Sequence, residues 1–283
     1  MRIRRQWIHI FITLIVLIVL SPAPTWGQER PLWELGAGFL ILQAPDYRGS
    51  DENRRYLVPY PYFVYRGDIL RVERDRISGR IFQTDRLLLD VSLNGGVPVK
   101  SSDNLDRRGL PDIDPTFEIG PSLNVTLLEN RQDRYKLTLA LPVRAAFSTD
   151  FSSVRHQGWV FHPRLVFEKA DLITGSGVNM GISVGPRFTD AGYHRYVYAI
   201  DPPYATPSRR SYDPGGGYSG STLTLGLNKN LKPFTINAFV SLDFLQGAAF
   251  EESPLIKTKT AVMAGFTFSW IFLKSSRMTE KRD

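Results

Sequence analysis

The 283-residue sequence contains no cysteine, which excludes disulfide bonds, cysteine-ligated zinc and a thiol nucleophile. It has only four histidines, and no spacing of ligand-type residues indicates a metal or cofactor site. Removing Arg2, Arg4 and Arg5 lowers the net charge from +7 to +4. The remaining positive charge is spread along the chain, so the composition does not favour nucleic-acid binding.

One long apolar run occurs, near the N-terminus. Residues 1–27 combine a basic start, an apolar core from Ile8 to Leu20, and small residues at Thr25 and Gly27, which is the pattern of a secretory signal peptide. The alternative is a membrane anchor, but the run is shorter than the roughly 20 residues that a spanning helix needs. We therefore predict cleavage before Gln28. An exported chain that then spans a membrane without apolar helices must do so as a closed β-barrel.

Residues 261–272 sort by parity into two faces. Val262, Ala264, Phe266, Phe268, Trp270 and Phe272 form an apolar face, and small or polar residues lie between them. Similar alternation predicts strands at 33–41, 55–66, 87–93, 117–127, 135–147, 159–167, 178–188, 223–227 and 234–244. An apolar outer face with charges on the other face is typical of a transmembrane barrel.

The predicted inner face carries ionisable side chains of both signs. These lumen-facing candidates are Glu118, Lys136, Arg144, Arg164, Glu168, Arg187 and Asp243. Their mixed signs predict ion pairs that fill the interior, because an ion-selective pore needs a ring of one sign.

Long and short connectors alternate along the chain. Long loops are expected at 43–53, 98–114, 149–158, 190–220 and 246–258, with short turns between them. Outer-membrane barrels place long loops outside and short turns in the periplasm. If residues 68–84 form a hairpin, the fold is an all-β, antiparallel up-and-down outer-membrane barrel of about twelve strands, with ten as the alternative. The expected organisation is a barrel over residues 28–273 and a periplasmic tail over 274–283.

Tyr56, Tyr60, Tyr62 and Tyr65 fit either an interfacial belt or packing on a neighbouring strand. Pro59 and Pro61, which share one face of the same segment, predict a strand that is irregular, near a rim or partly unpaired, because proline cannot donate to the ladder.

With these features, the chain resembles the MipA/OmpV family of MltA-interacting outer-membrane proteins over nearly all of its mature length. The resemblance rests on Gly36 and Gly38 before a signature loop, on Pro59 to Tyr62, and on Gly109 to Asp114. The signature loop contains Pro45, Asp46, Tyr47, Gly49, Ser50, Asp51 and Glu52. The resemblance implies an outer-membrane barrel that acts as a scaffold between a murein hydrolase and a murein synthase, or a porin-like or adhesive surface protein.

Two candidate sites have simpler explanations. Asp46, Asp51 and Glu52 are hard oxygen ligands that suit calcium or cations bridging lipopolysaccharide, but their spacing matches no known ligand loop and favours a solvated acidic tip. Asp150, Ser152 and His156 are residue types of a serine hydrolase triad. However, their spacing indicates neither an oriented base nor an oxyanion donor. His162 is expected as a polar filler of the lumen and His194 as part of an aromatic outer loop. No catalytic residue is predicted.

The function favoured by the sequence is a non-enzymatic scaffold in the outer membrane of a Gram-negative cell. Its expected contacts are membrane lipid and lipopolysaccharide, with a murein hydrolase and synthase as candidate protein partners on the short turns and the basic tail. The alternative is a small passive channel or a surface adhesin and immunogen.

Overall fold

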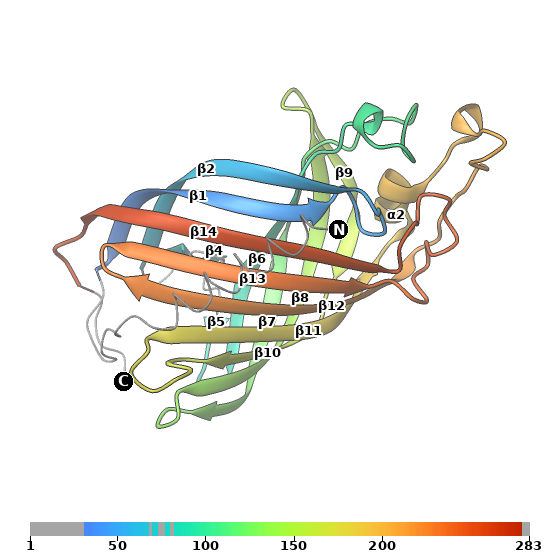
Figure 1. The fold of residues 1–283 in the computed structure, drawn as a ribbon. Coiled ribbons are helices and arrows are strands. Elements are labelled where there is room, and N and C mark those ends of the chain that lie inside the picture. Colours follow the sequence, from blue (N-terminus) through green and yellow to red (C-terminus); the bar gives the residue numbers. More distant parts are fainter. Residues whose placement is uncertain (1–30, 68–69, 73–76, 80–81, 279–283) are drawn as a thin grey trace.

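Figure 1 shows the computed structural model of the chain, which describes residues 31–67, 70–72, 77–79 and 82–278. The predicted signal peptide (1–27) and the last part of the predicted tail (279–283) lie outside the described residues. Across those described ranges, no helix has both the length and the apolar character needed to cross a membrane.

The described residues form fourteen strands, all paired antiparallel in one sheet. The strands are β1 (Trp33–Pro45), β2 (Asn53–Arg66), β3 (Leu70–Val72), β4 (Ile77–Gly79), β5 (Phe82–Gln83), β6 (Leu87–Gly96), β7 (Thr116–Asn130), β8 (Tyr135–Thr149), β9 (Val154–Phe161), β10 (Arg164–Lys169), β11 (Val178–Thr189), β12 (Gly217–Leu231), β13 (Phe234–Phe244) and β14 (Thr260–Lys274). Three short helices lie between strands: η1 (Ser101–Asp103), α2 (Ala191–Tyr198) and η2 (Pro202–Tyr204).

The sheet closes on itself as a barrel. Strand β1 pairs with both β2 and β14, and at the other end of the strand order β4 lies beside β6, which also pairs with β5. Strands β9 and β10 share one position around the barrel, and so do β4 and β5, which leaves twelve antiparallel strand positions. The predicted barrel class and the predicted count of about twelve are confirmed, and β3 and β4 pair antiparallel as the expected hairpin requires.

The long strands turn their apolar residues outward and most of their polar residues inward. On β7, Phe117 is 38% exposed while the adjacent Glu118 is 2% exposed, and on β14 the values are 51% for Trp270 and 1% for Ser269. A soluble barrel has the opposite arrangement, because water faces its outer surface. The outer surface therefore fits a hydrocarbon environment.

Aromatic side chains form a belt near each end of the outer wall. At the end with the long loops, Phe117 stacks on Phe147 at 5.3 Å and Phe161 on Phe188 at 6.2 Å between ring centroids. At the opposite end, the Phe234 and Phe268 centroids are 5.3 Å apart. Two such belts are typical of a barrel that crosses a bilayer.

The two ends of the barrel differ in their connections (Figure 1). The long-loop end carries residues 46–52, 97–115, 190–216 and 245–259, and the short-turn end carries turns such as 131–134 and 170–177. The first and last described segments meet at the short-turn end, where Pro31 bridges to Met278.

One expectation about local structure was wrong. Residues 149–158 are not a long loop, because β8 and β9 continue as a hairpin with a turn at 150–153. Of the two alternatives for the tyrosines of β2, Tyr60 and Tyr62 follow packing inside the barrel: Tyr62 is 3% exposed, and the Tyr60 hydroxyl lies 2.7 Å from Ser269 Oγ of β14 on the inner face. A Cβ on Gly38 would lie 2.5 Å from the Phe268 carbonyl oxygen and 2.9 Å from Cζ of the Tyr60 ring, which explains the glycine.

Candidate functional site

Four long loops pack together into one folded unit at the long-loop end, which we call the cap (residues 46–52, 97–115, 190–216 and 245–259). Its hydrophobic core draws on all four loops, including Tyr47, Val99, Tyr198 and Phe250. The Tyr198 and Phe250 rings stack with centroids 3.8 Å apart. The cap therefore has a core separate from the barrel wall, as a small domain would.

The signature loop turns sharply at Gly49, whose φ is +98°. A Cβ there would lie 2.4 Å from Ile256 Cδ1, while the Gly49 carbonyl accepts hydrogen bonds from the backbone N–H groups of Lys257 and Thr258. The left-handed backbone favours glycine here, and a larger residue would also displace the Ile256 side chain. The loop is thereby attached to residues 245–259.

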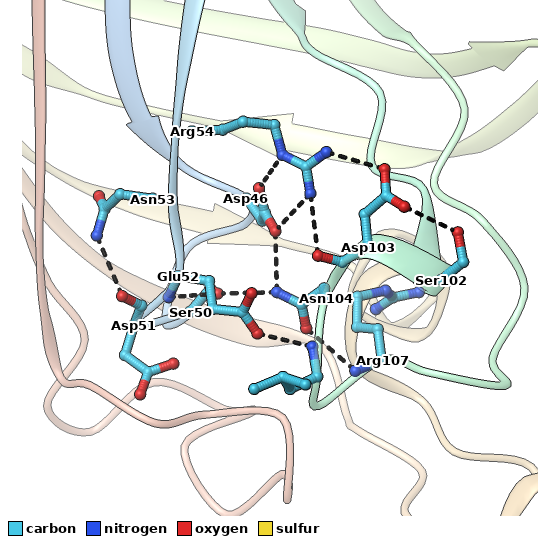
Figure 2. Close-up of polar contacts among 11 residues, drawn as sticks. Asp46, Ser50, Asp51, Glu52, Asn53, Arg54, Ser102, Asp103, Asn104 and Arg107 are labelled. Carbon is cyan, nitrogen blue, oxygen red and sulfur yellow. Dashed lines mark hydrogen bonds and ion pairs between the residues drawn. The ribbon is translucent and has the colours of Figure 1, made fainter.

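Asp46 connects the signature loop to the second cap loop, as Figure 2 shows. Its side chain accepts two hydrogen bonds from Arg54, at 2.8 Å from Nε and 3.2 Å from Nη2, and one from Asn104 Nδ2 at 2.9 Å. Arg54 also pairs with Asp103 at 3.3 Å. Such bidentate, charge-assisted contacts fix geometry strongly. Asp46 therefore joins residues 46–52 to residues 101–107.

The three acidic side chains of the signature loop do not converge on one point. Glu52 Oε1 accepts the backbone N–H of Leu105 at 2.7 Å, and the Asp51 carboxylate points away from Asp46 in Figure 2. Among the described residues, no group of three or more acidic, histidine or cysteine side chains is arranged to hold a metal ion. Asp46 and Glu52 make contacts within the cap instead.

Tyr47 and Arg107 anchor the centre of the cap. The Tyr47 hydroxyl donates to the Leu255 carbonyl at 2.8 Å, and the Arg107 guanidinium lies 5.6 Å from the Tyr47 ring centroid. Arg107 Nη1 also donates to the Val197 carbonyl at 2.6 Å. Burial raises the pKa of Tyr47 and lowers the pKa of Arg107. These two residues join the four loops through polar contacts that a loosened cap would lose.

Helix α2 attaches the cap to the inner wall of the barrel. Asp190 Oδ1 accepts the Tyr193 N–H at 3.0 Å and so caps the helix N-terminus. The Tyr193 ring faces the guanidinium of Arg187 on β11, with 5.6 Å between the ring centroid and Cζ. The helix thus lies against the polar interior of the barrel mouth.

Below α2, Arg187 belongs to a buried ion cluster. Glu118 binds Arg144 Nε at 2.8 Å and Arg187 Nη2 at 2.6 Å, and each of these three side chains is at most 11% exposed. Arg144 also donates to Ser92 Oγ at 3.2 Å. We call Glu118, Arg144 and Arg187 the mouth triad. It spans β7, β8 and β11.

The other lumen candidates lie elsewhere on the inner wall. Asp243 pairs with Arg48 of the signature loop at 3.1 Å and accepts a hydrogen bond from Thr222 at 2.5 Å. Lys136 and Glu168 are directly opposite each other on β8 and β10, near the short-turn end, and Arg164 is opposite Ala140 on the same strands. The structure therefore brings Glu118, Arg144 and Arg187 together in one ion cluster, sets Lys136 opposite Glu168, and pairs Asp243 with Arg48, which was not among the candidates.

The residues of the hypothetical hydrolase do not assemble. Asp150 accepts hydrogen bonds from Ser152, Ser153 and Arg155, and these contacts lower its pKa. His156 lies on β9, not in a loop, with its ring 5.4 Å from the Phe147 ring. A base oriented toward a serine is absent from this turn.

His194 is the buried histidine of the cap. Its Nδ1 lies 2.7 Å from the Gly215 carbonyl, which identifies Nδ1 as the donor, and its Nε2 contacts the hydroxyls of Thr189 and Ser219. Burial lowers its pKa, as do Arg187 and Arg48, while the Gly215 carbonyl acts in the opposite direction. Sequence reasoning missed this role because His194 gains its partners only when α2 forms.

We expect Asp46→Ala to loosen the cap while the barrel stays folded. Hydrogen bonds to charged groups contribute about 1.5–3 kcal/mol each, and Ala would leave Arg54 and Asn104 without their shared acceptor. Hydrogen exchange at residues 101–107 should accelerate. Asp51→Ala is the matched control, since the Asp51 carboxylate points away from Asp46, Arg54 and Asn104 in Figure 2. Equal acceleration in both variants would contradict the role of Asp46.

Acidification should also loosen the cap. Unfolded histidine titrates near pH 6.5, and folded His194 titrates lower, so the unfolded cap binds more protons between those two values. The stabilisation is complete above about pH 6.5 and is lost as the pH falls through the folded pKa. Limited proteolysis at residues 195–213 between pH 8 and pH 5 measures this. His194→Gln should flatten the pH profile, and His156→Gln should leave it unchanged.

Comparison with solved structures returns distant membrane barrels. An outer membrane channel from Pseudomonas putida F1 is 11% identical, with 89% of this chain and 100% of that chain covered and a TM-score of 0.47. The Pseudomonas putida toluene transporter TodX is 8% identical, with 90% and 93% covered and a TM-score of 0.29. The outer membrane protein OprG from Pseudomonas aeruginosa is 9% identical, with 86% and 97% covered and a TM-score of 0.23. These likenesses are too distant to carry a functional argument.

No curated protein sequence matches the chain. A family match does exist: the family described as MltA-interacting protein MipA matches residues 35–272. That range contains the signature loop, the cap and the long strands, apart from the first two residues of β1 and the last two of β14. Because it covers well over half of the sequence, the protein belongs to the MipA family.

Proposed function

We propose that the protein is an outer-membrane scaffold that binds murein-processing enzymes at its periplasmic rim. In this proposal residues 1–27 are removed, the barrel extends to residue 273, the long-loop end faces outside, and the short turns and the tail from Lys274 face the periplasm. N-terminal sequencing that begins at Gln28 tests the cleavage. Protease added to intact cells should cut residues 199–213 and spare the tail.

The observation that carries the proposal is the cap. Its four loops share a hydrophobic core, and α2 reaches the mouth triad, so the interior charges closest to the mouth already bind each other. A passive pore needs an open path and free charges, whereas a scaffold needs only a stable rim. The name of the family, MltA-interacting protein, also supports a binding role.

The short-turn end offers a surface for such a partner. Turns 131–134 and 170–177 are joined by an ion pair between Arg134 and Asp171 at 3.4 Å and by a hydrogen bond from the Ala170 N–H to the Arg134 carbonyl at 2.9 Å. Ile173 is 54% exposed on this joined surface. An exposed aliphatic residue rimmed by charges is typical of the centre of a protein interface.

A photo-crosslinker at residue 173 in living cells tests the proposal. We expect it to capture a murein hydrolase, and Ile173→Asp should abolish co-purification of that enzyme. Leu105→Asp is the matched control, because Leu105 is a 67% exposed apolar residue at the opposite end of the barrel. Capture of no periplasmic protein would count against the scaffold.

The second candidate function is a channel, which the barrel architecture favours. Purified protein in planar bilayers should show no stable conductance steps, and deletion of residues 191–213 should open the mouth and produce them. Reproducible steps from the intact chain, together with no periplasmic partner, would replace the scaffold with the channel.

A further inference from the structure

A cavity of about 750 Å³, largely open to solvent, lies in the cap between β9, α2 and the chain on either side of the Ile200–Tyr212 bridge. Its volume falls in the range of small-molecule sites, about 300–1,000 Å³. Helix α2 approaches β9 closely at one wall, where a Cβ on Gly192 would lie 2.8 Å from the Gln157 carbonyl oxygen. The close packing of α2 on β9 gives the cavity a fixed wall.

Several polar groups of this cavity face solvent. Within the described part of the chain, the exposed side chains of His156, Asp201 and Ser211 line the cavity and make no hydrogen bond or ion pair, although Asp201 lies near enough to Arg195 to interact with its charge. Arg195 and Asp213, by contrast, neutralise each other through two contacts of 2.5 and 2.6 Å. Because Arg195 and Asp213 offset each other, the Asp201 carboxylate gives the lining a net negative charge, which disfavours phosphate and carboxylate ligands.

Aromatic rings form part of the same lining. Tyr196 and Tyr212 are held by their hydroxyls, which contact the Asp114 N–H at 2.8 Å and the Ala249 carbonyl at 3.3 Å. Fixed aromatic rings offer flat apolar surface at little entropic cost, and the unpaired carboxylate, imidazole and hydroxyl can hydrogen-bond to alcohols. We propose that this cavity binds a neutral saccharide.

The position of the cavity indicates where such a saccharide could come from. The His156 ring lies 5.4 Å from the Phe147 ring and 5.7 Å from the Trp159 ring, both on the outer aromatic belt. The cavity therefore opens next to the belt that marks the membrane interface. A saccharide there comes either from lipopolysaccharide or from solution. The assignment of lipopolysaccharide as the source rests on the proposed orientation, in which the long-loop end faces outside. Saccharide binding itself depends on neither that orientation nor the scaffold function.

Calorimetry on the full purified protein in detergent tests the inference. The probes are dephosphorylated oligosaccharide released from lipopolysaccharide, the same oligosaccharide with its phosphates, intact lipopolysaccharide, and maltohexaose. Ser211→Trp should fill the cavity and weaken saccharide binding at least tenfold. Ser208→Trp, an exposed residue of the same loop that does not line the cavity, is the matched control. Asp201→Ala, at an exposed site, provides a second variant if Ser211→Trp fails to fold.

Loss of oligosaccharide binding in Ser211→Trp or Asp201→Ala, but not in Ser208→Trp, supports the site with lipopolysaccharide as the source. The same pattern with maltohexaose alone supports the site with a soluble source. Binding of intact lipopolysaccharide alone, unaffected by the variants, would assign the ligand to the lipid-facing wall and overturn the inference. A tenfold preference for the phosphorylated oligosaccharide, or no saccharide binding, would also overturn it.

Discussion

Replacing Glu118 with alanine should lower the free energy of unfolding by about 3–5 kcal/mol, because it leaves the two buried guanidinium groups of Arg144 and Arg187 without their carboxylate. The expected loss is large because both cations stay in the protein interior. A denaturant titration of refolded protein in detergent, followed by tryptophan fluorescence, measures it. The cap should loosen as well, since Tyr193 of α2 faces Arg187.

Two further variants separate charge from packing. Glu168→Ala removes an exposed carboxylate on the same inner wall and should change stability by only about 0.5 kcal/mol. Replacing all three members of the mouth triad with methionine should recover much of the loss, because a well-packed apolar group avoids the desolvation cost of buried charges. If Glu118→Ala costs no more than Glu168→Ala, the triad does not stabilise the mouth.

The wall of the barrel was predictable because lipid and lumen impose different chemistry on alternate residues. Phe117 beside Glu118 and Trp270 beside Ser269 carry this signal in the sequence itself. Loop-length alternation then gave the strand count. Mixed charges on the inner face predicted ion pairs, but the strand register was needed to select Glu118, Arg144 and Arg187 as partners.

The cap was not predictable in the same way. Its core joins Tyr47, Val99, Tyr198 and Phe250, which are far apart in the sequence and follow no common period. Helix α2 was hidden inside a loop of 31 predicted residues, 190–220, although Asp190 is a favourable N-cap residue. The signature loop was found by family resemblance, and only the structure explains it, through the contacts of Asp46 and Gly49.

The stability cost of a new charge on β14 should depend on its depth in the bilayer and on the face that it occupies. Phe266 faces outward near the middle of the strand, opposite Ile41 on β1 and Ala238 on β13. Phe266→Arg places a guanidinium in hydrocarbon and should cost about 2–4 kcal/mol near the bilayer midplane. Val262 lies on the same face but closer to the long-loop end. In Val262→Arg the new charge should therefore lower the free energy of unfolding by only about 0–1 kcal/mol.

The inner face supplies the comparison that tests this assignment. Thr267 Oγ1 accepts a hydrogen bond from Asn237 Nδ2 at 2.7 Å, at the end of a row of amides that includes Asn228 and Asn179. An arginine at 267 would face these polar side chains and not lipid, so Thr267→Arg should cost much less than Phe266→Arg. Refolding titrations into lipid vesicles measure all three variants. Equal costs for Phe266→Arg and Thr267→Arg would mean that β14 does not present opposite faces to lipid and lumen, and that the outer wall does not contact a bilayer.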